Sequence, residues 1–369
     1  MPGNPKISII IPVYNTARYL RPCLDSVINQ PLTDIEIICI NDGSTDESLS
    51  ILQEYSLKDS RIKLIDHKIN RSVSQARKSG VDIASGKYTL FIDGDDTLEP
   101  NACGDLYNLI VSKDLDVLHF GINVVNGGHL PDDKIRGFVR FSQPFPGELR
   151  EREIFDYFLE RKYGYNLWGK LFKTDLCKKA YCFVADGYYP KAEDLYAFFM
   201  IAFFAKSYYG ASDKKYYNYY LGRGITGLKT MDLEKLKIYC SKIYVTEKIK
   251  QFLLENNMFS RYAAGYERIY HEMLNECVES WYKLLSPSAK VAGYNILVQY
   301  LGVSDVESTL AGIQANEQEI HLNNKNIFIH LRHKIIGFFR CWKKYGIDYS
   351  VRVTFNEIKR LLFINKTGV

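Results

Sequence analysis

Residues 6–15 have the sequence KISIIIPVYN, in which every residue of Ile7–Val13 except Ser8 is apolar. A nearly continuous apolar run predicts a β-strand that is buried on both faces, as strands are in parallel sheets covered by helices. In such sheets, ligands bind beyond the carboxyl ends of the strands. We therefore expect Tyr14 and Asn15, which follow the run, to lie at a ligand site.

The chain continues with alternating strands and helices. The apolar patterns predict strands at Ile35–Ile40, Ile62–Ile65 and Tyr88–Ile92, and helices at Leu20–Ile28 and Ser74–Ala84. This alternation predicts an α/β fold with a Rossmann-like, mostly parallel sheet and helices on both faces. From Met231 onward, segments rich in Leu, Ile, Lys and Glu predict a helical C-terminal region.

Acidic residues follow two of the predicted strands. Asp93, Asp95 and Asp96 fall within four positions, and such carboxylates repel one another unless a cation holds them. Hard oxygen ligands suit Mg²⁺ or Mn²⁺. The alternative is a solvated acidic turn, in which Asp and Gly are common. Asp42 also has two interpretations: a hydrogen-bond acceptor for a base or ribose, or part of a turn before a helix.

Composition and charge exclude several classes of protein. The chain is 46% hydrophobic and 25% charged, which is typical of globular proteins, and it has no run of about 18 apolar residues that could span a membrane. Its eight cysteines form no C-x-x-C pair, which argues against a zinc finger or a thioredoxin-like motif. The amino terminus lacks a signal-peptide pattern, which predicts a cytoplasmic location.

The positive charge is concentrated in the tail. Residues 325–369 hold ten Lys or Arg and two acidic residues, a net charge of +8, whereas residues 1–324 hold 38 basic and 41 acidic residues. We therefore expect no nucleic-acid partner for the main body. Residues 325–344 hold six Lys or Arg and no acid, with apolar residues at helical spacing. They predict either an anionic membrane surface as partner, or packing on the catalytic domain or on a second subunit, as in a homodimer.

Four segments, in their order and spacing, resemble the family-two glycosyltransferases of the GT-A fold. They are residues 6–15 (KISIIIPVYN), 41–48 (NDGSTDES), 76–86 (ARKSGVDIASG) and 91–96 (FIDGDD). Residues 167–172 (LWGKLF) and 192–194 (AED) match later landmarks of the family. The resemblance covers about residues 5–228 and fades after that.

The resemblance implies a donor site. The residues that would line the pocket for the base are Pro12, Val13 and Tyr14. Asp42 would contact the base, and Arg77 would face the base or the ribose. Asp93 and Asp95 would form the D-x-D pair, with Asp95 as the chief ligand of Mn²⁺ or Mg²⁺.

The resemblance also implies the residues of the reaction. Asp194 of the pair Glu193-Asp194 would be the general base, although without the family context an exposed helix start is the favoured interpretation of this pair. Trp168 and Lys170 would lie near the donor or the acceptor, and Arg223 would contact the diphosphate. The sequence departs from the family pattern at four positions: Ser72 for a glycine, Lys78 for an asparagine, Gly94 for another small residue and Leu221 for an arginine.

Together these features predict an inverting, metal-dependent glycosyltransferase that uses a nucleotide sugar, with a UDP-linked donor as the resemblance implies. Its acceptor would be a saccharide or a lipid-linked saccharide in the synthesis of a bacterial surface polysaccharide, such as a capsule or a lipooligosaccharide. The chemistry is consistent, because a cation neutralises the leaving diphosphate and a carboxylate accepts the proton of the attacking hydroxyl. The alternatives are a nucleotidyltransferase of similar fold and a non-catalytic glycan-binding protein.

We expect three parts in the chain: a GT-A domain at 1–228, a helical extension at 229–322 and a basic amphipathic tail at 323–369. Within the GT-A domain, residues 1–100 would form the nucleotide-binding half and residues 101–228 the acceptor half. The tail would place the enzyme on the inner face of the cytoplasmic membrane.

Overall fold

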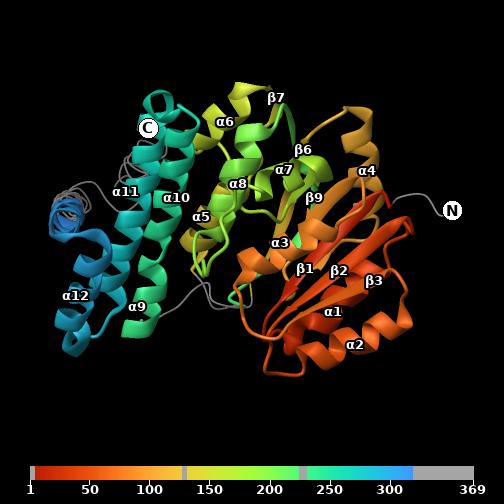
Figure 1. Ribbon diagram of the computed structural model, residues 1–369, viewed down its shortest axis with the longest axis horizontal. Coiled ribbons are helices and arrows are strands. Elements are labelled where there is room, and N and C mark those ends of the chain that lie inside the picture. Colours follow the sequence, from red (N-terminus) through yellow and green to blue (C-terminus); the bar gives the residue numbers. More distant parts are fainter. Residues whose placement is uncertain (1–4, 127–130, 224–230, 319–369) are drawn as a thin grey trace, which may run out of the picture. The chain divides into compact units, whose positions relative to one another are not determined.

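The structure is a computed structural model, and it describes residues 5–126, 131–223 and 231–318 (Figure 1). The predicted basic tail lies outside the described residues. The chain divides into two compact units, Met1–Val303 and Ser304–Val369. In the second unit, residues 304–318 are helical. The division at residues 228 and 322 stays a prediction.

The first unit is built from strands and helices that alternate over its first two thirds. The strands are β1 (Ile7–Val13), β2 (Ile35–Asp42), β3 (Ile62–His67), β4 (Tyr88–Phe91), β5 (Thr97–Leu98), β6 (Val117–Asn126), β7 (Gly147–Arg150), β8 (Lys170–Lys173) and β9 (Ser207–Leu221). The helices among them are α1 (Ala17–Ile28), α2 (Ser48–Lys58), α3 (Val73–Ile83), α4 (Ala102–Ser112), α5 (Asp132–Ser142), α6 (Arg152–Leu159), α7 (Thr174–Tyr181) and α8 (Glu193–Phe204). The helices that follow are α9 (Leu233–Cys240), α10 (Lys242–Glu255), α11 (Phe259–Leu284), a 3₁₀ turn at Pro287–Ala289 and α12 (Lys290–Leu301).

The strands form one mixed sheet in the order β3-β2-β1-β4-β8-β6-β9-β5, with β7 paired to β9. The pairs β3–β2, β2–β1 and β1–β4 are parallel, and so is β6–β9. The remaining pairs, such as β4–β8 and β6–β8, are antiparallel. The predicted fold class is confirmed, and the predicted strands and helices of the first ninety residues are present within a few residues at each end.

Helices cover both faces of the parallel half of the sheet (Figure 1). Because side chains alternate along a strand, Ile9 and Ile11 of β1 join the core under α1, α2 and α4, whereas Ile10 points to the other face. On that face α3 crosses β1 and β2 and packs against α7 and α8. All seven residues of β1 are buried, as its apolar sequence predicts.

The strand order reverses beside β1. The chain runs from β1 outward to β2 and β3, and then returns to pair β4 with the other edge of β1. The registers place Val13 of β1 beside Asn41 of β2, and Ile10 beside Phe91 of β4. The carboxyl ends of β1, β2 and β4 therefore meet at one edge, which is the topological switch point where ligands bind in such sheets.

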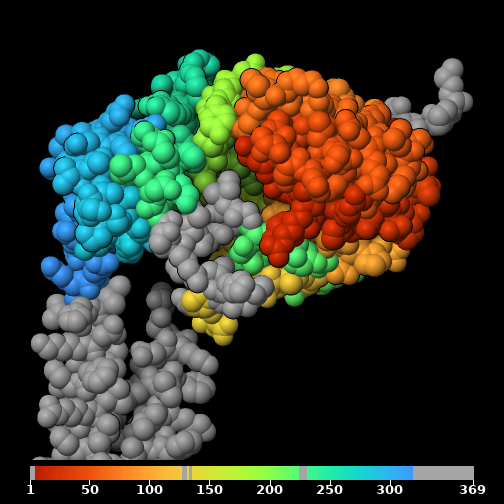
Figure 2. Space-filling view, turned by 90° about the horizontal axis from the view of Figure 1, so that it is seen from below, coloured from red at the N-terminus to blue at the C-terminus, as the bar shows by residue number. Residues whose placement is uncertain are grey.

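The C-terminal helices α10 and α11 pack on α8 and α6. Aromatic rings fill this contact, among them Phe155 of α6, Phe199 of α8 and Phe252 of α10, with Phe155 and Phe199 4.9 Å apart between ring centroids. In Figure 2, the residues of the first hundred positions, red to orange, form one contiguous part of the surface. Over the described residues, no helix is both long and apolar enough to cross a membrane.

Candidate active site

A cavity of about 290 Å³ lies at the switch point. Its walls come from the ends of β1, β2 and β4, the start of α3 and the loop before α8. It is lined by Pro12, Val13, Tyr14, Thr16, Asp42, Asn70, Ser72, Val73, Arg77, Asp93, Gly94, Asp95, Tyr188, Pro190 and Glu193. Segments separated by more than 180 residues therefore meet in one site.

Two exposed tyrosines stand at this cavity. Tyr14 is 49% exposed and Tyr188 is 60% exposed, although both line the cavity wall. Exposed aromatic rings at a cavity are platforms for stacking a base or a sugar ring. The sequence motifs pointed to Tyr14 but missed Tyr188, because the loop before α8 carries no motif of its own.

At the end of β2, a buried network fixes one oxygen of Asp42. Asp42 Oδ1 accepts hydrogen bonds from the backbone N–H of Arg71 (2.9 Å) and from Nδ1 of His67 (2.8 Å). A carboxylate only accepts, so Nδ1 carries the proton, and Nε2 lies 3.0 Å from the Ser79 hydroxyl. Asp42 is 2% exposed, and its Oδ2 has no hydrogen-bond partner in the described structure. His67 and Ser79 were not predicted, since only their spatial arrangement connects them to the site.

The three carboxylates of the acidic turn after β4 lie in two different environments. Asp96 is buried and accepts from the Tyr217 hydroxyl (2.8 Å) and from the backbone N–H of Tyr220 (2.9 Å), so it ties the turn to β9. Asp93 and Asp95 line the cavity instead. Burial, together with the charge of Asp93, raises the pKa of Asp95 to about 6. The turn is not the solvated loop of the alternative interpretation.

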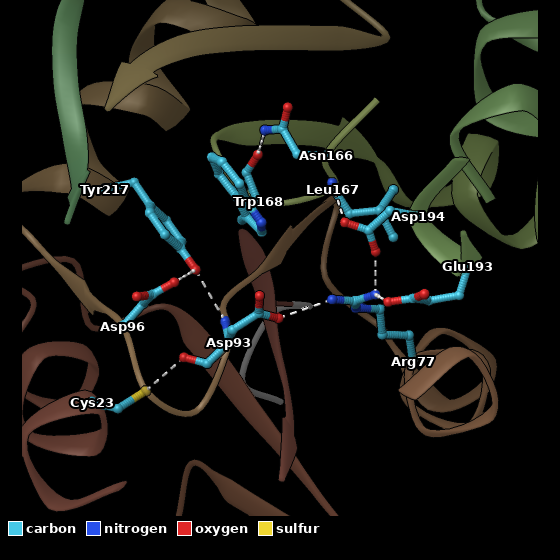
Figure 3. A network of polar contacts seen from close by, with 10 residues as sticks. All are labelled: Cys23, Arg77, Asp93, Asp96, Asn166, Leu167, Trp168, Glu193, Asp194 and Tyr217. Carbon is cyan, nitrogen blue, oxygen red and sulfur yellow. Dashed lines mark hydrogen bonds and ion pairs between the residues drawn. The ribbon is translucent and has the colours of Figure 1, made fainter. Parts of the chain in front are cut away.

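Arg77 of α3 connects this turn to the start of α8 (Figure 3). Its guanidinium, 3% exposed, donates to Asp93 Oδ1 (2.9 Å) and to Asp194 Oδ1, and it lies 3.9 Å from Glu193 Oε1. Burial by itself would lower the pKa of Arg77, but the facing carboxylates, Asp194 first, raise it. A buried arginine with these partners holds β4, α3 and α8 in one arrangement.

The pair Glu193-Asp194 begins α8, where acidic side chains interact favourably with the positive end of the helix. Glu193 lines the cavity. Asp194 accepts hydrogen bonds from Arg77 and from the backbone N–H of Leu167 (3.4 Å; Figure 3). Burial is the main cause that raises the pKa of Glu193 to about 7, and the charge of Asp194 is the second cause. Both side chains are largely buried, so this helix start differs from the exposed one of the alternative interpretation.

Three further predicted residues do not line the cavity. Lys170 is completely buried, donates to the carbonyl oxygen of Asn166, and has its pKa lowered by burial. Trp168 is stacked on Tyr217 in the interior (Figure 3). Arg223 lies next to the acidic turn, where its Nη1 donates to the backbone oxygen of Asp95 (2.9 Å). Of the three, only Arg223 adjoins the groups that would bind a diphosphate.

The donor set at the acidic turn fits a hard divalent cation. Asp93 and Asp95 offer carboxylate oxygens at the cavity, and two neighbouring carboxylates repel each other unless a cation holds them. Across residues 5–126, 131–223 and 231–318, no group of three or more His, Cys, Asp or Glu side chains is arranged to hold a metal ion. Mg²⁺ commonly takes one or two carboxylates from a protein and completes its shell with phosphates and water.

A mixed sheet with these helices, a switch-point cavity and an acidic turn after its fourth strand is the arrangement expected of a glycosyltransferase of the GT-A type. The comparisons with known proteins agree. The model of the family "Glycosyl transferase family 2" matches residues 8–173. EpsH of Bacillus subtilis (strain 168) is 30% identical over 262 residues, which are 70% of this chain and 72% of EpsH. The chain belongs to glycosyltransferase family 2.

Two other similarities are informative. The poly(ribitol-phosphate) beta-glucosyltransferase of Bacillus spizizenii is 40% identical over 129 residues, which are 34% of this chain and 20% of that enzyme. The crystal structure of S. aureus TarS 1-349 in complex with UDP-GlcNAc has a TM-score of 0.51 and 20% identity, and the similarity covers 84% of this chain and 92% of that one. The second similarity shows the fold.

Proposed function

We propose that this glycosyltransferase moves a sugar from a UDP-linked donor to a hydroxyl group of a saccharide or a lipid-linked saccharide, with inversion at the anomeric carbon. TarS, which shares the fold, has been solved with UDP-GlcNAc and with UDP. The poly(ribitol-phosphate) beta-glucosyltransferase acts by its name on a poly(ribitol-phosphate), which supports a polymer as the acceptor.

One observation carries the proposal of a nucleotide-sugar site in this cavity. Buried polar atoms almost always have hydrogen-bond partners, so those without one call for an explanation. In the described structure, four cavity-lining residues each hold a buried polar atom with no partner: Thr16 Oγ1, Asp42 Oδ2, Ser72 Oγ and Arg77 Nε. A polar ligand with both donors and acceptors would satisfy them, and the tyrosines at the cavity would stack its rings.

The reaction is a single displacement. The acceptor hydroxyl oxygen attacks the anomeric carbon, the bond from that carbon to the diphosphate oxygen breaks, and UDP leaves with the bonding electrons. We propose that Asp194 accepts the hydroxyl proton, with Glu193 beside it at the cavity. Arg77 would hold Asp194 and Asp93 at a fixed separation. Arg223 would face the diphosphate across the backbone of Asp95.

A divalent cation would be held by Asp95, with Asp93 beside it. When bound, it would neutralise the charge that develops on the leaving diphosphate. Asp96 would not take part, because both of its oxygens are engaged by β9.

The test is UDP release from a panel of UDP-sugars, with saccharide acceptors and with Mn²⁺, Mg²⁺ or a chelator. We expect metal-dependent release with one donor. Asp95→Ala should lower turnover by about 10²-fold or more, since a Lewis acid contributes several kcal/mol to such a step. Its melting temperature should not fall, because the change removes a buried charge that repels Asp93.

A matched control is Asp82→Ala, an exposed acid on α3 that lies away from the cavity and should keep full turnover. Normal metal-dependent turnover by folded Asp95→Ala protein would exclude Asp95 as the metal ligand.

A further inference from the structure

A second pocket, of about 270 Å³, lies at the other end of α8 from the cavity. Its walls come from the start of α6, the last turn of α7, the end of α8 and the start of α11, and α6 and α7 both pack on α8 (Figure 1). Glu193 of the cavity begins α8, whereas Phe203 and Phe204 of the second pocket end it. The two sites are therefore about 15 Å apart along the helix.

Aromatic rings line the inner part of this pocket. Phe155 and Tyr262 are buried, and the Phe155 ring centroid lies 4.9 Å from that of Tyr262 and 5.2 Å from that of Phe203. Phe203 and Phe204 are only half-buried, although the residues before them in α8 are buried. Phe183, which is 42% exposed, continues the aromatic surface, with its ring centroid 5.0 Å from that of Phe204. The pocket therefore suits an apolar group.

Three exposed cations also line the pocket: Arg152, Lys179 and Lys206. In the part of the chain that the structure describes, none of them forms an ion pair, and Lys179 Nζ instead lies 4.3 Å from the centroid of the Phe204 ring. Among the described residues that line the pocket, Glu151 is the one acid. The lining thus has a net charge of +2, although residues 1–324 hold three more acidic than basic residues.

The position of Arg152 is electrostatically unfavourable within the fold. Arg152 is the first residue of α6, where the positive end of the helix dipole disfavours a cation. Lys179, in contrast, lies in the last turn of α7, where a cation is favourable. An anion bound in the pocket would offset the repulsion at Arg152, so this residue favours a negatively charged ligand.

We propose that this pocket binds a single-chain lipid phosphate. The phosphate lies between Arg152, Lys179 and Lys206, and the start of the apolar chain lies on the aromatic rings. The charges and the rings together match a ligand that is anionic at one end and apolar at the other. Ligand pockets usually measure about 300 Å³ or more, so this one has room for one chain rather than two.

The pocket gives the lipid-linked acceptor of the proposed function a place for its lipid end, and this part of the inference rests on that function. The lipid phosphate would bind at one end of α8 while the donor occupies the cavity at the other end. One lipid chain gives only weak, reversible attachment to a membrane. The pocket is therefore a site for an individual lipid and not for the membrane surface.

The first experiment is titration calorimetry of the full chain with farnesyl phosphate below its critical micelle concentration. Farnesol carries the chain alone, inorganic phosphate the anion alone, and dihexanoyl phosphatidic acid a phosphate on two chains. We expect farnesyl phosphate to bind at least about 10-fold more tightly than each of them, because only it uses both the cations and the rings. Equal or tighter binding of any of the three would overturn the inference, and so would a failure of farnesyl phosphate to bind.

Substitutions then locate the site. Arg152→Gln, Lys179→Gln and Lys206→Gln change exposed residues, so each variant should melt within about 2 °C of the wild-type chain. Each should bind farnesyl phosphate about 5-fold more weakly, as expected for one basic residue near an anionic lipid. Lys178→Gln is the matched control, since Lys178 is the exposed neighbour of Lys179 on α7 and does not line the pocket. If the three variants bind as tightly as Lys178→Gln, the phosphate does not lie in this pocket.

Activity separates this inference from the proposed function. None of the three variants should change the affinity for UDP or the rate of transfer to a saccharide without a lipid. With a saccharide linked to farnesyl phosphate, their KM for this acceptor should rise by about 5-fold. An unchanged KM would overturn the role of the pocket in acceptor binding. A wild-type chain that binds farnesyl phosphate but no UDP would overturn the proposed donor and support the lipid site.

Discussion

At the scale of single residues, Arg77 decides how the acidic groups are arranged. Its one buried guanidinium contacts carboxylates from the acidic turn after β4 and from α8, so this turn and the start of α8 cannot move apart independently. Asp194 takes the closer contact with this guanidinium, whereas Glu193 lines the cavity. The two acids therefore differ in their contacts, and substitutions can separate their roles.

Asp194→Asn is nearly isosteric but cannot accept a proton. We expect turnover to fall by about 10²-fold or more while the affinity for UDP changes little. Glu193→Gln is the paired control and should retain most of the rate. Single-turnover rates and UDP affinities of both variants check this. The opposite result, a slow Glu193→Gln and a fast Asp194→Asn, would make the cavity-lining Glu193 the base.

His67 acts on the site through Asp42. His67→Phe keeps an aromatic ring but removes the Nδ1–H donor, so Asp42 Oδ1 would keep only the bond from Arg71. We expect KM for the UDP-sugar to rise by about 10-fold with kcat nearly unchanged. His67→Asn restores a hydrogen-bond donor near the position of Nδ1, so its KM should lie between those of His67→Phe and the wild-type chain.

The control for His67→Phe is His119→Phe. His119 is also a buried histidine with two hydrogen bonds, to the Tyr208 hydroxyl and the backbone oxygen of Ser142, but it lies in the core away from the cavity. The His119→Phe variant should therefore lose stability without a change in KM for the UDP-sugar. Equal KM values for His67→Phe and the wild-type chain would show that His67 only supports the fold.

At the scale of elements, α3 is the helix whose position matters most, because it carries Ser72 at its start and Arg77 in its second turn. Gly80 allows its close approach to the sheet: a Cβ there would lie 2.6 Å from Ile10 Cγ2 and 3.1 Å from Ile40 Cδ1. The glycine thus sets the distance between α3 and the strands β1 and β2.

Gly80→Ala should push α3 away from the sheet and lower the free energy of unfolding by about 1–3 kcal/mol. The affinity for UDP should fall as well, since the helix carries two groups of the cavity. Gly104→Ala on α4 is the matched control, because a Cβ there meets nothing within 4 Å. It should stabilise the chain by up to about 1 kcal/mol. Chemical denaturation measures the free energy of unfolding of each variant, and titration with UDP measures its affinity. A Gly80→Ala variant that is more stable than the wild-type chain would contradict the packing argument.

At the scale of the whole molecule, the basic segment 325–344 supports a prediction from sequence alone. Its six Lys or Arg and its apolar residues at helical spacing are typical of a helix that lies in the headgroup region, and each basic residue adds about 1 kcal/mol near anionic lipid. We expect the full chain to co-sediment with anionic liposomes at low salt, and a chain ending at Asn324 to remain in the supernatant.

Neutral liposomes and high salt serve as controls, since both should abolish the sedimentation. The mass of each chain in solution tests the other interpretation: a dimer that becomes a monomer on truncation, without lipid binding, would assign the segment to a second subunit.

The sequence by itself determined the parallel half of the sheet around β1 and the edge at which the cavity lies. Strands such as Ile35–Ile40 were predictable because a strand buried on both faces needs an apolar run, whatever packs on it. Asp42, Asp93 and Asp95 could be placed at one edge because parallel strands bring their carboxyl ends together. These are consequences of local pattern and of a general rule of topology.

Only the tertiary structure decided which side chains reach the cavity. Lys170 lies within a recognisable motif, yet it points into the core, because β8 is an interior strand of the sheet. Arg77 and Asp194 are 117 positions apart, and nothing in the sequence pairs them. Tyr188 reaches the cavity through a loop without a motif. Contacts of this kind depend on the rotation of each helix and the course of each loop, which are set by packing between distant segments rather than by the residues beside them.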